Sequence, residues 1–414
     1  MLDIHSVNFI FRADTYYWID LKGIFLTVQS KSSTTNRRVN MLTSSAESFE
    51  IRVIKNWNDF ATLKEDWQNL LVQSDADNLF LTWEWMDCWR IVQGELITPL
   101  IIVIQDSQGI LAIAPFYIQQ YRLAHLVTYK ALRFMGDKSS GAEYSDFIVK
   151  AGNSVELKRM LWNHLLSSNV KPCWDFIWFT NVSTWTFGGE ALLQSLSVIK
   201  ELKFNKRTTD FAQVALSNFN TGLLPKLSKS LRTNIRQTMR RLDKMGPWRV
   251  EVSSADSSVN DHLNKLFLLH NKHWQNTGFG SFERNPELVD FYRVFVPLAL
   301  KKGWLRLLRL ESNGEIQAMQ LGYVYNNEFL AIQEGFNPDF IPGIGQVLRY
   351  YSFTNCQEEG LSCYDFLGVY TDHKRRWLAD KKLGSNIFIW HPKMKNIPFS
   401  IQEIWPTGRY LKPI

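Results

Sequence analysis

The stretch Trp304-Leu-Arg-Leu-Leu-Arg-Leu310 is followed by Glu311-Ser-Asn-Gly314 and then by Glu315-Ile-Gln-Ala-Met-Gln-Leu-Gly-Tyr323. Two short apolar runs on either side of a glycine-containing turn are typical of a β-hairpin. The same order of run, turn and run occurs earlier in the chain, in Pro99–Tyr117, where the turn is Asp106–Gly109. The sequence therefore predicts two hairpins of similar layout.

Each predicted hairpin is followed by further strand, a helix and a short strand that carries an Asp-Phe pair. The pairs are Asp175-Phe176 in the first half and Asp365-Phe366 in the second. Repeated order at long spacing indicates two copies of one fold, each of a size that suits a domain. The alternative is that hairpin, helix and strand recur by chance in a mixed fold. We predict an α/β (α+β) class with two related domains.

The length of 414 residues suits two domains better than one. Residues 1–47 are expected to be a poorly ordered extension or an over-extended gene start, because regular patterning begins near Phe49. The other predicted parts are an N-terminal domain at 48–220, a basic linker helix at 221–246, a C-terminal domain at 247–391 and a tail at 392–414.

The composition excludes several classes of protein. Apolar residues make up 45% of the chain, as in a folded soluble protein. The cysteines are Cys88, Cys173, Cys356 and Cys363, too few for a disulfide framework and without a C-x-x-C pair, so a cytoplasmic location is expected. The most apolar long stretch, Pro99 to Ile118, is interrupted by polar residues, so we expect no stable membrane insertion.

A predicted helix from Leu223 to Met245 carries much of the excess of 47 Lys and Arg over 40 Asp and Glu. At 3.6 residues per turn its leucines share one face, while cations share the opposite face. The cations are Lys229, Arg232, Arg236, Arg240 and Lys244. Like charges at this spacing repel, which favours an anionic partner. The alternative is a solvated face without a ligand.

A glycine-containing turn, Asn337–Gln346, connects a predicted strand at Glu328–Phe336 to a predicted helix that starts near Gly345. Backbone N–H groups at a helix N-terminus bind phosphate well, so the turn is a candidate pyrophosphate site. The alternative is a turn that needs glycine for its backbone alone.

Two carboxylates are candidate bases: Glu334 precedes this turn, and Asp365 ends a later strand. Asp365 is followed closely by His373, Lys374 and further cations. Such a cluster can transfer protons and stabilise charge, or it can be a set of surface salt bridges.

Other catalytic patterns are missing from the sequence. His270 and His273 lie three residues apart on a predicted helix, but no glutamate separates them and no cysteine is near, so we expect no metal site. The chain has no G-x-S-x-G, no Walker loop and no dinucleotide G-x-G-x-x-G after a strand.

Several strings occur in a definite order from about Phe49 to Trp390. They are Trp83-Glu84-Trp85 with Trp89, Ile113-Ala-Pro-Phe116, Leu132-Arg-Phe-Met-Gly136, Tyr144-Ser-Asp-Phe147, Leu227-Ser-Lys-Ser-Leu-Arg-Thr-Asn-Ile-Arg236, His270 with Trp274, Gly303-Trp-Leu-Arg-Leu307, and Asp365-Phe366 with Lys374 and Trp377. In this order the chain resembles the CelD-like acetyltransferases, a branch of the GNAT superfamily related to the FemAB-type transferases.

The resemblance implies two tandem GNAT-like domains, each a mixed, mostly antiparallel sheet flanked by helices, joined by the basic helix. It implies acetyl-CoA or another acyl-CoA as donor, bound by the C-terminal domain, and an aminoacyl-tRNA donor in the FemAB relatives. Carried onto this chain, the donor-binding residues are Gly343, Ile344, Gly345, Gln346 and Lys374. Arg232, Arg236, Arg240 and Trp274 are the candidate anion or substrate contacts.

Two positions depart from the family pattern. The turn Phe340–Gly345 lacks the leading Gln or Arg of the GNAT loop, and His373 stands where relatives often have tyrosine. The resulting hypothesis is transfer of an acyl group to a small-molecule or glycan amine in polysaccharide or cell-envelope biosynthesis. The alternatives are an aminoacyl transferase whose basic helix contacts tRNA, and a non-catalytic scaffold for polysaccharide synthesis.

Overall fold

The computed structural model describes residues 49–94, 97–123, 126–137, 140–219, 222–253, 258–275, 282–400 and 411–413. Residues from Ser48 onward belong to one compact unit. The predicted extension at 1–47 lies outside the described residues. Within the predicted tail at 392–414, residues 401–410 and 414 also lie outside them. The division into the predicted parts therefore stays a prediction.

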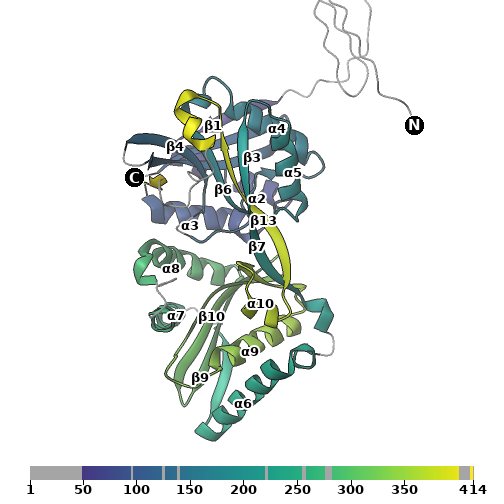
Figure 1. Cartoon of the computed structure of the whole chain (residues 1–414), viewed down its shortest axis with the longest axis vertical. Helices are drawn as coiled ribbons and strands as arrows, with labels where there is room; N and C mark the ends of the chain where they lie inside the picture. The colour runs from purple at the N-terminus through teal and green to yellow at the C-terminus, as the bar shows by residue number, and fades with distance from the viewer. Residues whose placement is uncertain are drawn as a thin grey trace, which may run out of the picture. The chain divides into compact units, whose positions relative to one another are not determined.

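The first half of the chain contains the predicted hairpin and a strand, helix and strand after it (Figure 1). Its elements are β1 (Glu50–Ile54), α1 (Trp57–Ala61), α2 (Lys64–Leu71), η1 (Leu79–Leu81), α3 (Trp83–Gln93), β2 (Thr98–Asp106), β3 (Gly109–Leu123), β4 (Val127–Phe134), β5 (Ile148–Val149), α4 (Ser154–Leu165), η3 (Lys171–Cys173), β6 (Phe176–Val182), α5 (Phe187–Ser197) and β7 (Lys203–Ala215).

The second half repeats this order. Its elements are η4 (Leu216–Phe219), η5 (Leu224–Lys226), α6 (Lys229–Met245), β8 (Trp248–Val252), α7 (Val259–Trp274), η6 (Phe282–Arg284), α8 (Pro286–Lys301), β9 (Leu305–Ser312), β10 (Glu315–Tyr325), β11 (Glu328–Phe336), α9 (Ile344–Glu358), β12 (Cys363–Gly368), α10 (Asp372–Arg376), β13 (Asp380–Trp390), η7 (Met394–Ser400) and β14 (Leu411–Pro413).

The described strands form one sheet in the order β1-β2-β3-β4-β6-β13-β7-β12-β11-β10-β9-β8, with β5 and β14 paired to β3. Neighbouring strands are antiparallel except for two pairs, β4 with β6 and β11 with β12. Each parallel pair is connected by one helix, α4 in the first half and α9 in the second. The mixed, mostly antiparallel α/β class predicted from the sequence is confirmed.

β7 of the first half and β13 of the second half each pair with a strand of the other half's parallel pair. β7 follows the first half in the chain but pairs with β12 of the second, and β13 pairs with β6 of the first. β7 and β13 also pair with each other over eleven residues, from Lys203↔Trp390 to Gln213↔Asp380. In Figure 1 the teal β7 and the yellow β13 lie side by side where the two parts of the sheet meet.

Both predicted hairpins are present, and their turn residues explain them. Asn313 and Gly314 have φ angles of 53° and 80°, the left-handed pair that a tight two-residue hairpin needs. In the other hairpin the Asp106 carboxylate accepts hydrogen bonds from the backbone N–H groups of Gln108 and Gly109. Such Asx contacts favour a turn over a continued strand.

The basic helix begins later than the sequence predicts. Pro225 lies in a separate 3-10 turn, and the Ser228 hydroxyl then caps α6 by accepting from the Leu231 N–H. The helix ends at Gly246, whose φ of 133° favours glycine. Its apolar face packs against α9 of the second half.

Candidate active site

The parallel strands β11 and β12 separate partway along their length. They pair at Glu328↔Cys363, Phe329↔Tyr364 and Leu330↔Asp365, and the pairing ends there. β11 continues to Phe336 beside β10, whereas β12 turns toward β7. From Ala331 onward, one side of β11 therefore faces a gap instead of a strand.

A cavity of about 710 Å³ occupies this gap. The walls come from α7, β11, the start of α9, the end of β12 and α10. The lining residues are His270, His273, Trp274, Ala331, Ile332, Gln333, Glu334, Phe336, Gly343, Gly345, Gln346, Arg349, Phe366, Gly368, Thr371, His373 and Lys374. The cavity thus brings together the predicted Glu334, Gly343, Gly345, Gln346, Lys374 and Trp274.

The N-terminus of α9 opens onto the cavity through Gly343, Gly345 and Gln346, whereas the Ile344 side chain is buried in the core. Gly343 has φ of 91° and lies against α6, because a Cβ there would meet the Thr238 hydroxyl at 2.6 Å. The side-chain oxygen of Gln346 is buried and has no hydrogen-bond partner in the described residues. An unpaired polar atom beside a helix N-terminus indicates a site prepared for a polar ligand.

The carboxylate of Glu334 is held firmly. Gln320 Nε2 donates to Glu334 Oε1 at 2.7 Å, Arg349 Nε donates to the same oxygen at 3.0 Å, and Arg349 Nη2 donates to Oε2. Arg349 Nη1 lies 2.8 Å from His373 Nε2. Burial, with Arg349 nearby, lowers the pKa of His373 to about 4, so at neutral pH this ring is uncharged and accepts from the guanidinium.

Lys374 fixes the end of β12. Its ammonium group donates to the carbonyl oxygens of Phe366, Leu367 and Gly368 at 2.8, 3.1 and 3.0 Å. These bonds match the three protons of an ammonium group, so its side chain shapes the cavity wall. Burial lowers the pKa of Lys374 to about 8, although Glu143 and Asp365 act in the opposite direction.

Asp365 lies behind the cavity wall and is fully buried. Its Oδ2 accepts from the Tyr144 hydroxyl at 2.5 Å and from Gln213 Nε2 at 3.0 Å, and its Oδ1 accepts from the Leu367 N–H. Burial raises the pKa of Asp365, while these hydrogen bonds oppose the rise. The structure does not place this predicted base among the residues that line the cavity.

Glu143 comes from the first half and was not predicted from the sequence. Its carboxylate accepts from the Gly368 N–H, and its Oε1 lies 3.4 Å from the position that a Cβ of Gly368 would take. Oε2 is buried without a partner in the described residues. Burial, reinforced by the nearby Asp365, raises the pKa of Glu143 to about 8. No local pattern around Glu143 points to this role, because its neighbours come from distant segments.

The wall formed by α7 is aromatic. His270 is buried, and its Nδ1 lies 2.8 Å from the backbone oxygen of Glu334. The ring centroids of His273 and Phe336 are 3.9 Å apart. Trp274 packs beside His273 at 4.7 Å. The two histidines therefore serve packing in the wall. Over the described residues, no three side chains of the metal-binding types gather as metal ligands would.

The predicted anion contacts Arg232, Arg236 and Arg240 do not line the cavity. Arg232 donates to the backbone oxygen of Pro225 at 3.1 Å, and Arg236 and Arg240 are exposed on α6. Thr238 of α6 contacts the turn before α9, because its hydroxyl donates to the Pro342 oxygen at 3.2 Å.

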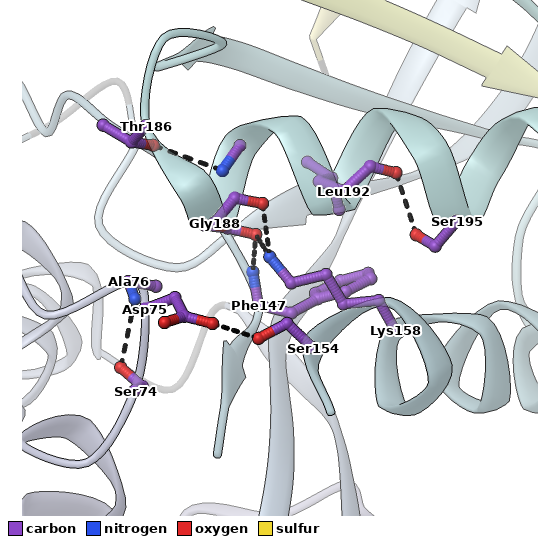
Figure 2. A network of polar contacts seen from close by, with 12 residues as sticks. Ser74, Asp75, Ala76, Phe147, Ser154, Lys158, Thr186, Gly188, Leu192 and Ser195 are labelled. Atoms are coloured by element: carbon purple, nitrogen blue, oxygen red, sulfur yellow. Dashed lines mark hydrogen bonds and ion pairs between the residues drawn. The ribbon is translucent and has the colours of Figure 1, made fainter. Parts of the chain in front are cut away.

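At the equivalent helix of the first half, α4, protein groups contact the first turn and the Lys158 side chain (Figure 2), and a smaller cavity of about 240 Å³ lies nearby, lined in part by Asp75 and Asp146. The Ser154 hydroxyl, in the first turn of α4, donates to the Asp75 carboxylate. Lys158 is fully buried and donates to Asp146 at 2.5 Å and to the Gly188 oxygen at 2.8 Å. A carboxylate and a buried ion pair thus stand where α9, in the second half, opens onto a cavity.

Sequence comparison agrees with this asymmetry. Residues 229–375 match the family model of an acetyltransferase (GNAT) domain. This GNAT match covers α6 to α10, the part of the chain that builds the cavity, and it supports acyltransferase activity. No curated protein matches the chain significantly in sequence.

Solved structures resemble the chain over both halves. FemX superposes with a TM-score of 0.59 at 12% identity, over 82% of this chain and 98% of FemX. The C-terminal DUF2156 domain of a candidate lysylphosphatidylglycerol synthetase from Agrobacterium fabrum gives 0.50 at 14% identity, over 83% and 96%. At these identities the likeness concerns the fold alone. The repeat of hairpin, helix and strand predicted from the sequence is present in the structure, and the GNAT match covers its second copy.

Proposed function

We propose that this protein is a GNAT-type N-acyltransferase that moves an acyl group from acyl-CoA to an amine at the cavity between β11, β12 and α9. The observation that carries the proposal is the separation of β11 from β12 beside the glycine-rich N-terminus of α9. Such a gap exposes backbone N–H groups along β11, and a helix N-terminus attracts phosphate. Gly343, Ile344, Gly345 and Gln346 would hold the donor pyrophosphate.

The reaction follows from this placement. The acceptor nitrogen attacks the donor carbonyl carbon, the C–S bond breaks, and the thiolate leaves and takes up a proton. A backbone N–H of β11 would stabilise the oxyanion, and close alignment of both substrates would supply much of the rate. Glu334 is the predicted base that can meet a substrate, because it lines the cavity. Three hydrogen bonds keep its carboxylate in place.

Asp365 and Lys374 take supporting roles in this proposal. Asp365 holds Tyr144 and Gln213, and Lys374 holds three carbonyl oxygens at the end of β12. Both therefore position the wall beside the reacting groups. Trp274 and the α7 wall would contact the acceptor. The donor site is assigned to the second half because Asp75 and Lys158 fill the matching position in the first.

Acetyl as the transferred group, a glycan or small-molecule amine as acceptor, and a role in polysaccharide or cell-envelope biosynthesis rest on the resemblance to CelD-like acetyltransferases. An acyl-CoA donor is consistent with a cytoplasmic reaction. Across the described residues no helix is both long and apolar enough to cross a membrane.

The test is calorimetric titration of acetyl-CoA into the wild type and Gln346→Glu. The substitution keeps the side-chain size and places a negative charge beside the phosphates, so the dissociation constant should rise at least about tenfold, equivalent to 1.4 kcal/mol. Gln194→Glu, on the exposed side of α5, adds the same charge elsewhere and should bind like the wild type. Equal affinity of all three proteins would refute the placement of the site.

A second candidate function is an aminoacyl-tRNA-dependent transfer, favoured by the cation face of α6. Apart from the contact of Arg232 with Pro225, no ion pair or side-chain hydrogen bond is found for its cations within the described part of the chain. Phosphate contacts release counterions, so tRNA affinity should fall steeply as salt increases. The double variant Arg236→Glu with Arg240→Glu should abolish tRNA binding. The control is Lys64→Glu with Lys150→Glu, which changes the net charge by the same amount but at two positions in the first half. Absent or salt-independent tRNA binding excludes this candidate.

A further inference from the structure

One end of the first-half sheet combines exposed apolar side chains with lysines. β4 and β6 are parallel and begin at this end, and β13 ends there, since both Ala131 and Trp390 are paired with Phe176. β7 begins at the same end, because Lys203 is paired with Trp390. The strand order thus gathers the start of β4, the start of β7 and η7 in one region.

Apolar side chains protrude from this end. Met394 is 88% exposed and Ile397 is 63% exposed on η7, and Leu126 is 85% exposed just before β4. η7 is held beside β4, because the Tyr129 hydroxyl donates to the Lys395 backbone oxygen at 2.8 Å. In Figure 1, η7 is the yellow helical segment near β4. Large apolar groups that remain exposed together indicate a binding surface.

A cavity of about 560 Å³ lies between η7 and the ends of β7 and β13. Its apolar lining includes Phe204, Trp390, Pro392, Met394 and Ile397, and its rim includes Lys203 and Lys393. An apolar cavity bordered by lysine ammonium groups can bind a hydrocarbon chain, while the ammonium groups pair with the anionic headgroup that the chain carries.

The charge around this cavity is positive. Lys203, Lys393 and Lys395 are exposed. Burial lowers the pKa of His391 to about 4, and the positive charges of the nearby Lys393 and Lys171 lower it further. Of the nearby acids, Asp175 is only 13% exposed and is paired with Lys395 at 2.8 Å. The exposed Glu201 lies between Lys200 and Lys203, so the balance stays cationic.

We propose that this lysine-rich end, defined by Leu126, Lys203, Lys393, Met394 and Ile397, docks the protein on the surface of an anionic lipid bilayer. Long apolar side chains can enter the interface between headgroups and acyl chains while lysines stay at the headgroup level. Negatively charged lipids attract the lysines. Separate apolar side chains that protrude around a cavity can each enter a fluid lipid surface, whereas a flat protein partner would contact them poorly. RNA has no apolar surface that would bury Met394 and Ile397.

The test is co-sedimentation of the full chain with phosphatidylcholine vesicles that contain or lack phosphatidylglycerol. The wild type should partition onto the anionic vesicles at low salt, and less at high salt, because salt screens exposed charges. Met394→Asp with Ile397→Asp, and separately Lys203→Glu with Lys393→Glu, should each lower partitioning at least tenfold. Circular dichroism and gel filtration of each variant establish that it folds.

Two matched controls complete the design. Leu268→Asp replaces another exposed apolar side chain, on α7 of the second half, and should leave partitioning unchanged. Arg236→Glu with Arg240→Glu should also leave it unchanged, since α6 lies outside the proposed surface. The proposal is overturned if the wild type ignores anionic vesicles, if the surface variants bind like the wild type, or if the α6 variant alone abolishes binding. It is equally overturned if the surface variants change only the oligomeric state, because the surface would then join two copies. None of these outcomes depends on acyl-CoA binding.

Discussion

At the scale of single residues, Glu143 joins the first half of the chain to the active-site wall of the second. Its carboxylate lies against Gly368, close to Lys374 and Asp365, and one of its oxygens has no partner in the described residues. Two carboxyl groups and one ammonium group in a buried space cannot all be ionised without cost. The raised pKa of Glu143 is the result, and it has a measurable consequence.

Glu143→Gln should change the pH dependence of stability. The pKa of Glu143 is about 8 in the folded chain and 4.5 ordinarily, so wild-type stability is lost progressively as pH rises through this window. Glutamine does not titrate, so the variant should gain roughly 3 kcal/mol relative to the wild type between pH 5 and pH 7.5. Urea denaturation at both pH values measures the difference. A difference that does not change with pH would show that Glu143 titrates normally.

The residue scale also shows the limits of the sequence. The glycine turn and Glu334 were predicted because they lie near each other in the chain, and Lys374 was predicted because it follows Asp365 closely. Residues of the turn, Glu334 and Lys374 all line the cavity. The three carbonyl oxygens that the Lys374 ammonium group contacts could not be predicted, because no spacing in the sequence reveals them. Arg349 was not predicted, because nothing in the sequence pattern of a helix shows that one of its cations pairs with a carboxylate on a distant strand.

At the scale of elements, α4 and α9 occupy matching places but have different surroundings. Each carries a buried cation paired with a carboxylate, Lys158 with Asp146 and Arg349 with Glu334. At α4, Asp75 meets the first turn and Lys158 reaches α5, and the smaller cavity of about 240 Å³ beside them is lined by no residue of α4. Around α9 the space is open. We infer that the first-half helix stabilises the fold and the second-half helix binds the donor.

Lys158→Met tests this division. Removing the cation leaves Asp146 buried and unpaired, which should destabilise the fold by about 3–5 kcal/mol. The acyl-CoA affinity of the protein that remains folded should not change. Arg159→Met is the matched control, because its pair with Glu156 is 48% and 56% exposed and should contribute at most about 1 kcal/mol. Denaturant unfolding and calorimetry together measure both effects, and loss of acyl-CoA binding by folded Lys158→Met would contradict the division.

Local sequence patterns predict where helices and hairpins lie more accurately than they predict where helices begin and end. The turn residues Asn313-Gly314 predicted their hairpin correctly, because the backbone angles there are set by those two residues. The amphipathic pattern over 57–71 predicts a single helix, but the structure has two helices there, α1 and α2. Thr62 ends α1 because its hydroxyl donates to the Asp59 backbone oxygen at 2.7 Å, a local bond that competes with the helix.

At the scale of the whole molecule, the exchange of β7 and β13 makes the two halves interdependent. Each strand completes the sheet of the other half. The halves also share an aromatic core, since the Trp85 ring lies 4.7 Å from both Phe291 and Phe295. The sequence predicted the duplication but not the exchange, because strand order depends on pairings between residues about 180 positions apart, such as Lys203 and Trp390.

The exchange predicts cooperative unfolding. Phe388→Ala, in β13, removes a side chain buried in the core of the first half, and Phe353→Ala, in α9, removes one buried in the core of the second half; each should cost about 3–5 kcal/mol. Both should lower one common transition, because neither half keeps its sheet without the strand from the other. Thermal unfolding followed by tryptophan fluorescence and far-ultraviolet circular dichroism distinguishes the cases. Two separate transitions, each shifted by only one of the variants, would show that the halves fold independently.

The central claim is that the second half alone binds the acyl donor, in the gap between β11 and β12. The most direct measurement is hydrogen exchange of the backbone amides with and without acetyl-CoA. The account predicts added protection at residues 331–334 and 343–347, and none at residues 154–158 in the first turn of α4. Protection at α4, or no protection at β11 and the start of α9 under saturating acetyl-CoA, would contradict it.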